Sequence, residues 1–212
     1  MDTRSLKSIE SIPKQSGPIV SDEELMMSFQ KGDAHAFNEL IRRHHSGIYN
    51  FMVRFLGNAE SAEEAFQEVF IRVIKASDSY SPQAKFTTWV YTIARNYCID
   101  MTRKGRFRKV LSLDDKSGEK DGAKIEDRLL DEKADPQGYV AAQHLTAYLE
   151  KSLDTLNPDQ REVFLLREKQ GLPFEEIAKV VGTSVNTVKS RMRYALLSLQ
   201  EEFKKIGITK PK

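Results

Sequence analysis

The 212-residue chain has a single cysteine, Cys98, and no apolar run longer than four residues. One cysteine excludes an internal disulfide framework and any zinc site made from several thiolates of one chain. The short apolar runs predict neither a transmembrane helix nor a secretory signal, so we expect a cytoplasmic protein without membrane insertion. Net charge is also nearly absent, with 33 Lys and Arg against 31 Asp and Glu. A site for a polyanion would therefore need local segregation of charge.

The motifs of common catalytic sites are missing as well. The sequence contains no P-loop, nucleophile elbow or Gly-rich phosphate cradle. His44 and His45 are adjacent, so on a helix they would point about 100° apart and would not share a metal-binding face. Cys98 falls in an expected helix, which favours a buried structural thiol over a redox sensor. The sequence therefore predicts no catalytic residue, no metal site and no cofactor.

Apolar residues recur at helical spacing and strand-like alternation is absent, so the predicted fold is all-α. Residues 1–20 hold four serines and no periodic apolar pattern, which predicts a mobile tail. Ser21 and Glu24 form a capping box at the start of the first expected helix. Further helices are expected at 34–56, 60–76 and 86–104, then from near Tyr139, and at 158–169, 174–181 and 184–203.

Residues 105–137 have a different composition. Lys, Asp, Gly and Ser dominate, and the stretch from Asp114 to Asp135 holds nine acids against five bases. A segment of ~30 such residues is long for a loop inside a compact domain. It predicts a flexible acidic linker between two domains.

The most specific pattern is a pair of short helices within residues 174–193. Ala178 would lie at the crossing of the helices, Gly182 would supply a left-handed turn, and Val188 would be an apolar anchor. Ser184 can cap the second helix. A solvated face on an ordinary helical hairpin is the alternative, but small residue, glycine, anchor and basic face all fall in register. The outward face carries groups suited to base edges and phosphates in a major groove: Asn186, Thr187, Lys189, Ser190, Arg191 and Arg193.

A second pattern places aromatic and cationic side chains on the helix expected at 86–104. From Arg95 to Lys109 there are six bases and one acid. Aromatics beside a basic stripe suit single-stranded DNA, whose bases stack and whose phosphates pair with cations. For Trp89 and Tyr97 taken singly, a core anchor is favoured over a stacking platform, and Arg103 and Lys104 could merely complement the helix dipole. One side of the helix carries Thr92, Arg95, Asn96, Asp100 and Arg103.

A third pattern is an acidic outer face on residues 63–70, opposite the apolar side chains of Phe66, Val69 and Phe70. By itself this pattern fits a solvated helix face. The polar face consists of Glu63, Glu64, Gln67 and Glu68.

Together these segments resemble bacterial sigma factors of the sigma-70 family, in the small two-domain extracytoplasmic-function (ECF) class. Residues 88–96 look like that family's melting and −10 recognition helix, and residues 63–70 look like its helix that binds core polymerase. Residues 156–193 look like its C-terminal −35-binding domain. The resemblance covers about residues 21–104 and 138–204, in the family's order. Glu64 stands where the family usually has Asp, which is a conservative departure.

The resemblance implies a region 2 helical bundle at 21–104, the linker at 105–137, a region 4 helix-turn-helix domain at 138–204 and a tail at 205–212. The implied function is to bind core RNA polymerase, direct it to specific promoters and help melt the −10 region, without catalysis. Implied partners are core RNA polymerase, promoter DNA (duplex at −35 and single-stranded at −10) and an anti-sigma factor.

By the same resemblance the site residues fall into three groups. Core polymerase would contact Glu64, Gln67 and Glu68. The −10 element would contact Trp89, Thr92, Arg95, Asn96, Asp100 and Arg103. The −35 element would contact Ser184, Asn186, Thr187, Lys189, Ser190, Arg191 and Arg193.

Two other functions fit parts of the sequence. One is a stand-alone helix-turn-helix regulator with an N-terminal sensor or dimerisation domain, and the other is a protein-interaction adaptor. The basic and aromatic stretch at 86–109 and the helix carrying Gln67 and Glu68 favour the sigma factor.

Overall fold

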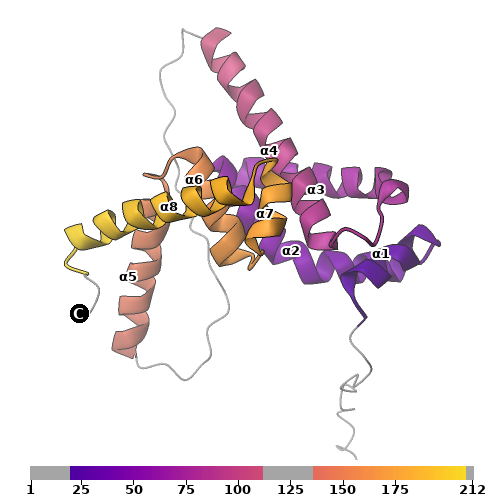
Figure 1. Ribbon diagram of the computed structural model, residues 1–212, viewed down its shortest axis with the longest axis horizontal. Helices are drawn as coiled ribbons and strands as arrows, with labels where there is room; N and C mark the ends of the chain where they lie inside the picture. The colour runs from indigo at the N-terminus through magenta and orange to yellow at the C-terminus, as the bar shows by residue number, and fades with distance from the viewer. Residues whose placement is uncertain (1–19, 112–135, 209–212) are drawn as a thin grey trace, which may run out of the picture.

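The computed structural model describes the backbone of residues 20–111 and 136–208 and the side chains of residues 20–104 and 145–208. Within these ranges the chain forms helices and no strand, which confirms the all-α prediction. None of the described helices has the length and apolar character needed to cross a membrane. In chain order the elements are α1 (Asp22–Gln30), α2 (Ala34–Leu56), α3 (Ala59–Lys75), the 3₁₀ turn η1 (Ser77–Ser79), α4 (Phe86–Leu111), α5 (Pro136–Leu153), α6 (Pro158–Phe164), the π-helical turn η2 (Leu165–Lys169), α7 (Phe174–Val181) and α8 (Val185–Lys205) (Figure 1).

The N-terminal unit is built around α2, which packs against α1, α3 and α4. Local signals in the sequence set the ends of these helices. The predicted capping box of Ser21 and Glu24 is present at the start of α1. Gly57 ends α2 in the left-handed conformation, with a φ of 71° that L side chains rarely adopt. The largest fully buried side chains of the unit include Met26, Leu40, Ile48, Phe51, Met52 and Phe86.

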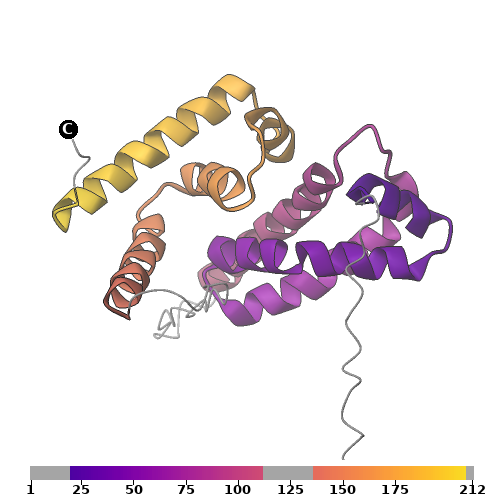
Figure 2. The ribbon, with the colours of Figure 1, turned by 90° about the horizontal axis from the view of Figure 1, so that it is seen from below.

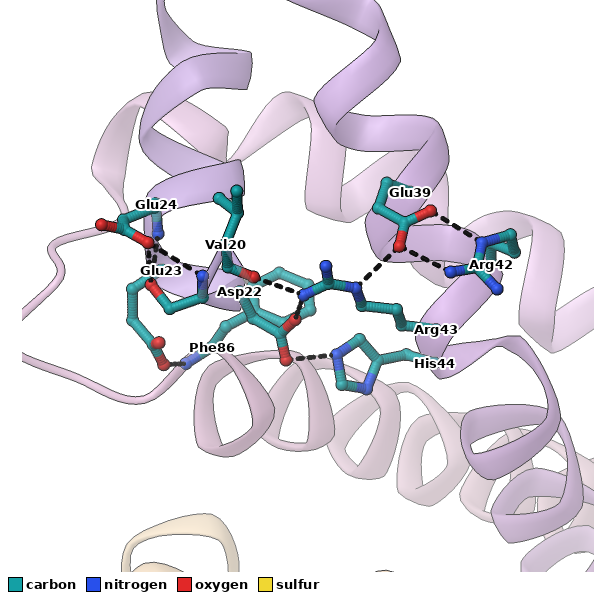
Figure 3. Close-up of polar contacts among 10 residues, drawn as sticks. Val20, Asp22, Glu23, Glu24, Glu39, Arg42, Arg43, His44 and Phe86 are labelled. Carbon is teal, nitrogen blue, oxygen red and sulfur yellow. Dashed lines mark hydrogen bonds and ion pairs between the residues drawn. The ribbon is translucent and has the colours of Figure 1, made fainter. Parts of the chain in front are cut away.

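Polar contacts at the start of α1 fix its position on two other helices (Figure 3). The Asp22 carboxylate accepts a hydrogen bond from Nη1 of Arg43 at 2.9 Å and lies 2.6 Å from Nε2 of His44, both on α2. The neighbouring carboxylate of Glu23 accepts a hydrogen bond from the backbone N–H of Phe86 at 3.0 Å. Because Phe86 is the first residue of α4, α1 is tied to the start of the helix that carries the expected −10 residues.

In the C-terminal unit, α7 and α8 form the predicted helix-turn-helix. Gly182 ends α7 in the left-handed conformation with a φ of 67°. Ser184 caps α8, since its Oγ accepts a hydrogen bond from the backbone N–H of Thr187 at 3.1 Å. Ala178 and Val188 are 7% and 0% exposed. The roles predicted for Ala178, Gly182, Ser184 and Val188 are therefore confirmed.

The helices flanking the predicted linker are longer than the sequence pattern indicated. α4 continues past Lys104 to Leu111, and α5 begins at Pro136 rather than near Tyr139. Arg, Lys and Leu are good helix formers, so Gly105, at a cost of about 1 kcal/mol, does not stop the propagation of α4. Proline at a first helical position is favourable. The mobility predicted for residues 1–20 and for the linker falls mostly on residues 1–19 and 112–135, which lie outside the described residues.

The two units pack against each other. α7 lies against α4 (Figures 1 and 2). The turn η2 packs against α2. The sequence predicted two domains but no contact between them. This contact covers part of α4, so it bears directly on the candidate nucleic-acid interface.

Candidate nucleic-acid interface

The solvent face of α8 carries most of the residues expected at the −35 element. Val188 and Met192, 0% and 5% exposed, hold the opposite face in the core of the C-terminal unit. Thr187 is half-buried, and its hydroxyl lies 2.9 Å from that of Ser184, so it also supports the cap. The exposed members of the set are Ser184, Asn186, Lys189, Ser190 and Arg193. These side chains form a polar and cationic surface that can reach base edges and phosphates.

Arg191 differs from its neighbours on α8. Its guanidinium donates a hydrogen bond to the carboxylate of Asp159, in the first turn of α6, and the side chain is 26% exposed. Its charge is thus partly compensated within the unit. Asp159 was not among the predicted site residues, because nothing in its local sequence indicates contact with a residue 32 positions away.

The exposed side of α4 carries Asn96, Asp100 and Arg103, which the sequence placed together. Thr92 lies half-buried beside them, and its hydroxyl donates a hydrogen bond to the backbone carbonyl of Thr88 at 2.7 Å. The described part of α4 therefore presents a polar row along one side. A row with hydrogen-bonding groups and a cation suits unpaired bases and their phosphates.

Trp89 packs against the core of the N-terminal unit. Its ring centroid lies 5.1 Å from that of Tyr80 and 6.2 Å from that of Phe86. Burial is also the main cause that raises the pKa of Tyr80, to about 12, with the nearby carboxylates of α1 adding to the shift. Trp89 thus lies in the core-anchor position that the sequence favoured over a stacking role.

Among the expected −10 residues, Arg95 is bonded to the C-terminal unit. Its guanidinium donates hydrogen bonds to the carboxylate of Glu162 in α6, and its side chain is 18% exposed. Glu162 is 4% exposed. Burial raises the pKa of this carboxyl, and the hydrogen bond from Arg95 opposes the shift. In this arrangement Arg95 is paired with a carboxylate rather than open to a nucleic acid.

Two further hydrogen bonds join α4 to the C-terminal unit. The hydroxyl of Thr88 donates to the carboxylate of Glu176 in α7, and this bond is the largest cause that lowers the pKa of Glu176. The hydroxyl of Tyr91 donates to Oε1 of Gln170 at 2.5 Å, and burial raises the pKa of Tyr91. Both donors are buried, with Thr88 at 6% and Tyr91 at 3% exposure.

A fourth contact between the units lies away from α4. The guanidinium of Arg54 in α2 meets the carboxylate of Glu150 in α5, with Nη2 2.6 Å from one oxygen and Nε 3.0 Å from both. Arg54 is 5% exposed. A bidentate pair of this kind fixes the orientation of its partners as well as their distance. The sequence gave no sign of it, because the two residues are 96 positions apart.

The polar face expected to meet the polymerase is open on α3. Glu64 and Gln67 are exposed, and Glu68 forms an i, i+4 ion pair with Arg72 at 3.1 Å. The face also includes apolar side chains that the sequence analysis did not single out, namely Ile71 and Ile74, which are 44% and 46% exposed. The sequence did contain a sign that Ile71 and Ile74 are exposed, because both fall outside the apolar stripe of α3 that is buried. Exposed apolar groups beside polar ones are common in protein-binding surfaces.

Two family models match the chain: Sigma-70 region 2 over residues 40–108, and Sigma-70, region 4 over residues 146–199. A curated relative, the ECF RNA polymerase sigma-E factor of Escherichia coli (strain K12), is 30% identical over 177 residues, which cover 82% of this chain and 89% of the relative. The ECF RNA polymerase sigma factor SigE of Mycolicibacterium smegmatis is 32% identical over 167 residues, which cover 78% of this chain and 61% of that protein.

Two solved structures have the same fold. CnrH in complex with the cytosolic domain of CnrY matches with a TM-score of 0.63 and 22% identity, covering 87% of this chain and 97% of CnrH. The sigma factor RpoE of Bartonella quintana, in complex with the anti-sigma factor NepR, matches with a TM-score of 0.58 and 24% identity, covering 79% of this chain and 96% of RpoE.

Proposed function

The chain belongs to the ECF class of the sigma-70 family, and from this premise we propose which of its surfaces meet RNA polymerase and promoter DNA. It is a sigma factor, which directs core RNA polymerase to promoters and acts in the initiation of transcription. The observation that carries the assignment of surfaces is their separation. The polar faces of α3, α4 and α8 lie on different helices, each opposite a buried apolar stripe.

α8 is the reader of the −35 duplex. Its exposed residues Asn186, Lys189 and Arg193 project from a helix whose other side is held rigidly by Val188 and Met192. A good base contact is worth about 1–3 kcal/mol of discrimination. Phosphate contacts by cationic side chains add affinity that depends on salt but carries no sequence information.

α4 is the helix that captures the melted −10 strand. Separating stacked bases costs a few kcal/mol per step, and capture of unpaired bases by the protein offsets this cost. Asn96, Asp100 and Arg103 are open for such contacts. Trp89, packed against Tyr80 and Phe86, supports the helix from the core side.

α3 is the docking surface for core polymerase. Glu64 and Gln67 offer polar groups, and Ile71 and Ile74 offer apolar area on the same helix. Polymerase performs the phosphoryl transfer, so the chain itself needs no catalytic group. This partner also supports the cytoplasm as the place of action.

An anti-sigma factor is a further proposed partner. CnrH and RpoE, which share the fold, were both solved in complexes, the first with the cytosolic domain of CnrY and the second with the anti-sigma factor NepR. We infer that a protein of the same kind controls this chain.

Run-off transcription from genomic fragments with purified core polymerase tests the proposal. We expect transcripts with defined start sites only when both the chain and core polymerase are present. Specific duplex binding by a dimer of the free chain, with no polymerase-dependent transcript, would instead support a stand-alone regulator.

A further inference from the structure

We propose that the C-terminal unit masks the Arg95 side of the −10 surface in the free protein, because a surface made of Glu162, Gln170 and Glu176 binds α4 in the place that DNA would take. We call these three residues the masking surface. The inference rests on the proposed function, since it requires the Arg95 side of α4 to be part of the −10 interface. It gives a role to three residues that lie outside the proposed polymerase and DNA surfaces.

The residues of α4 that meet the masking surface form one stripe. Thr88, Tyr91 and Arg95 are spaced three and four positions apart, so they lie on one face of the helix. Each is bonded to a different part of the C-terminal unit: Thr88 to Glu176 in α7, Tyr91 to Gln170 just after η2, and Arg95 to Glu162 in α6. Three consecutive parts of the C-terminal unit thus bind a single face of α4.

The chemistry of the contact resembles that of a nucleic acid. The carboxylate of Glu162 accepts hydrogen bonds from the guanidinium of Arg95, as a phosphate would. Glu176 likewise supplies an anionic acceptor to the hydroxyl of Thr88. An oligonucleotide that pairs with Arg95 must therefore displace Glu162, and the two ligands compete for one side chain.

We call the arrangement in which the masking surface contacts α4 the closed form. Its central ion pair favours closure only weakly, because both partners are largely buried. A carboxylate that is 4% exposed loses most of its hydration, and its pairing with Arg95 only partly offsets that loss. When the units separate, both groups recover water. The closed form gains instead from being intramolecular, because the two units belong to one chain and each is therefore at a high effective concentration near the other.

A second contact between the units, which we call the second latch, stabilises the closed form without involving α4. Arg54 and Glu150 form the bidentate pair between α2 and α5. Neither residue belongs to the proposed polymerase or DNA surfaces. Glu150 therefore offers a way to open the two units while leaving every expected DNA contact in place.

The test measures binding of the free full-length chain to a fluorescein-labelled single strand that carries the non-template −10 sequence of a promoter mapped by run-off transcription. The variant Glu162→Gln/Glu176→Gln keeps the shape of the masking surface but removes both charges. The matched control is Glu168→Gln/Glu175→Gln, which removes the same charge from exposed positions of the same unit. A third variant, Glu150→Gln, weakens only the second latch.

We expect Glu162→Gln/Glu176→Gln, called the masking variant below, to bind the strand about tenfold more tightly than the wild type. This is the gain expected if the masked side of α4 is open ~10% of the time in the wild type. Glu150→Gln should shift affinity in the same direction, and the control should bind like the wild type. Equal affinity of the wild type and the masking variant would overturn the proposal. An equal gain by the control would also overturn it, because simple loss of negative charge would then explain the effect.

The separation of the units is measured independently. Dyes on Cys residues introduced by Glu60→Cys and Gln200→Cys occupy exposed positions of α3 and α8, while Cys98 is fully buried. We expect energy transfer to fall in the masking variant and to be independent of protein concentration. Transfer that depends on concentration would mean that a second copy supplies the masking surface, and would overturn the intramolecular mechanism.

Transcription distinguishes failure of this inference from failure of the proposed function. We expect the masking variant and the wild type to give equal run-off yields with saturating core polymerase, because the polymerase then holds the units on DNA. Normal transcription with unchanged strand affinity would reject masking and leave the sigma function intact. Loss of transcription by both proteins would reject the proposed function itself.

Discussion

The carboxylate of Glu23 in α1 accepts a hydrogen bond from the backbone N–H of Phe86, 63 residues further along the chain, at 3.0 Å (Figure 3). The first N–H groups of a helix have no partner within it, and a side-chain acceptor there stabilises the helix by about 1 kcal/mol. Glu23 thus acts on α4 in the manner of a capping residue, but from another helix. It fixes where α4, the proposed −10 helix, begins.

Glu23→Ala is expected to lower the free energy of unfolding by about 1 kcal/mol and to reduce promoter melting, because the start of α4 loses its anchor. Thermal unfolding and permanganate reactivity of promoter thymines measure the two effects. Glu24→Ala is the matched control, since it removes the capping box of α1 without touching α4. We expect the control to cost similar stability and to leave melting unchanged. A parallel loss of melting in both variants would show that Glu23 acts only through the stability of α1.

The surface of α3 gives the second prediction. Gln67→Ala/Glu68→Ala should abolish binding to core polymerase and leave circular dichroism unchanged. Gln67 is exposed, and the pair of Glu68 with Arg72 is a surface contact of an i, i+4 kind, worth about 0.3–0.5 kcal/mol. Glu175→Ala/Gln200→Ala changes the same residue types on exposed sites of the C-terminal unit and should bind polymerase normally. Wild-type affinity in the α3 variant would contradict the assignment of this face.

The third prediction separates two neighbours on α4. Asn96 is exposed, whereas Arg95 is paired with Glu162. Asn96→Ala should reduce permanganate reactivity of promoter thymines in the polymerase complex more than it reduces formation of the closed complex. Arg95→Ala should do the same in the complex, but in the free protein it should also leave the buried Glu162 without its partner and loosen the two units. Equal losses of closed and open complexes in Asn96→Ala would indicate a structural role.

Which features could be predicted from the sequence depended on the range of the interaction. Ser21 with Glu24, Gly57, Gly182 and Ser184 act within a few residues, so their patterns indicated the helix ends correctly. The periodicity of apolar residues likewise placed the buried and open sides of α3 and α8, because a helix repeats every 3.6 residues. These short-range rules were sufficient for the fold class and for which sides of α3 and α8 face solvent.

Contacts between distant segments could not be predicted. Arg95 with Glu162 and Arg54 with Glu150 join residues 67 and 96 positions apart, and no periodicity encodes which surfaces of two units meet. Arg95 was therefore expected to be open, and Glu162 was not singled out at all. A glutamate directly before the apolar run Val163–Leu166 was the available signal, since a buried carboxylate needs a partner.

Cys98 gives the fourth prediction. The thiol is fully buried, and burial is the largest cause that raises its pKa, to about 12. The thiolate is the form that attacks a disulfide reagent, and a thiol with this pKa stays protonated at neutral and mildly alkaline pH. We expect no reaction with a chromogenic disulfide reagent at pH 8 in the native protein and complete reaction in denaturant. Rapid native reaction would reopen the possibility of a redox role.

The last prediction concerns Lys189 and Arg191 on α8, which differ in their surroundings. Lys189 is exposed, and Arg191 is paired with Asp159. Each phosphate contact contributes about −0.9 to the slope of log affinity against log salt concentration. We expect Lys189→Ala to make this slope less steep by ~0.9 for promoter duplex bound by the polymerase complex, if Lys189 contacts one phosphate. Asp159→Asn should increase the affinity for promoter duplex, because it frees the charge of Arg191. The double variant Asp159→Asn/Arg191→Ala is the control, since it should lose that gain. If Asp159→Asn weakens duplex binding and Arg191→Ala does not, the arginine serves the packing of α6 on α8 and the −35 contact must be made by its neighbours.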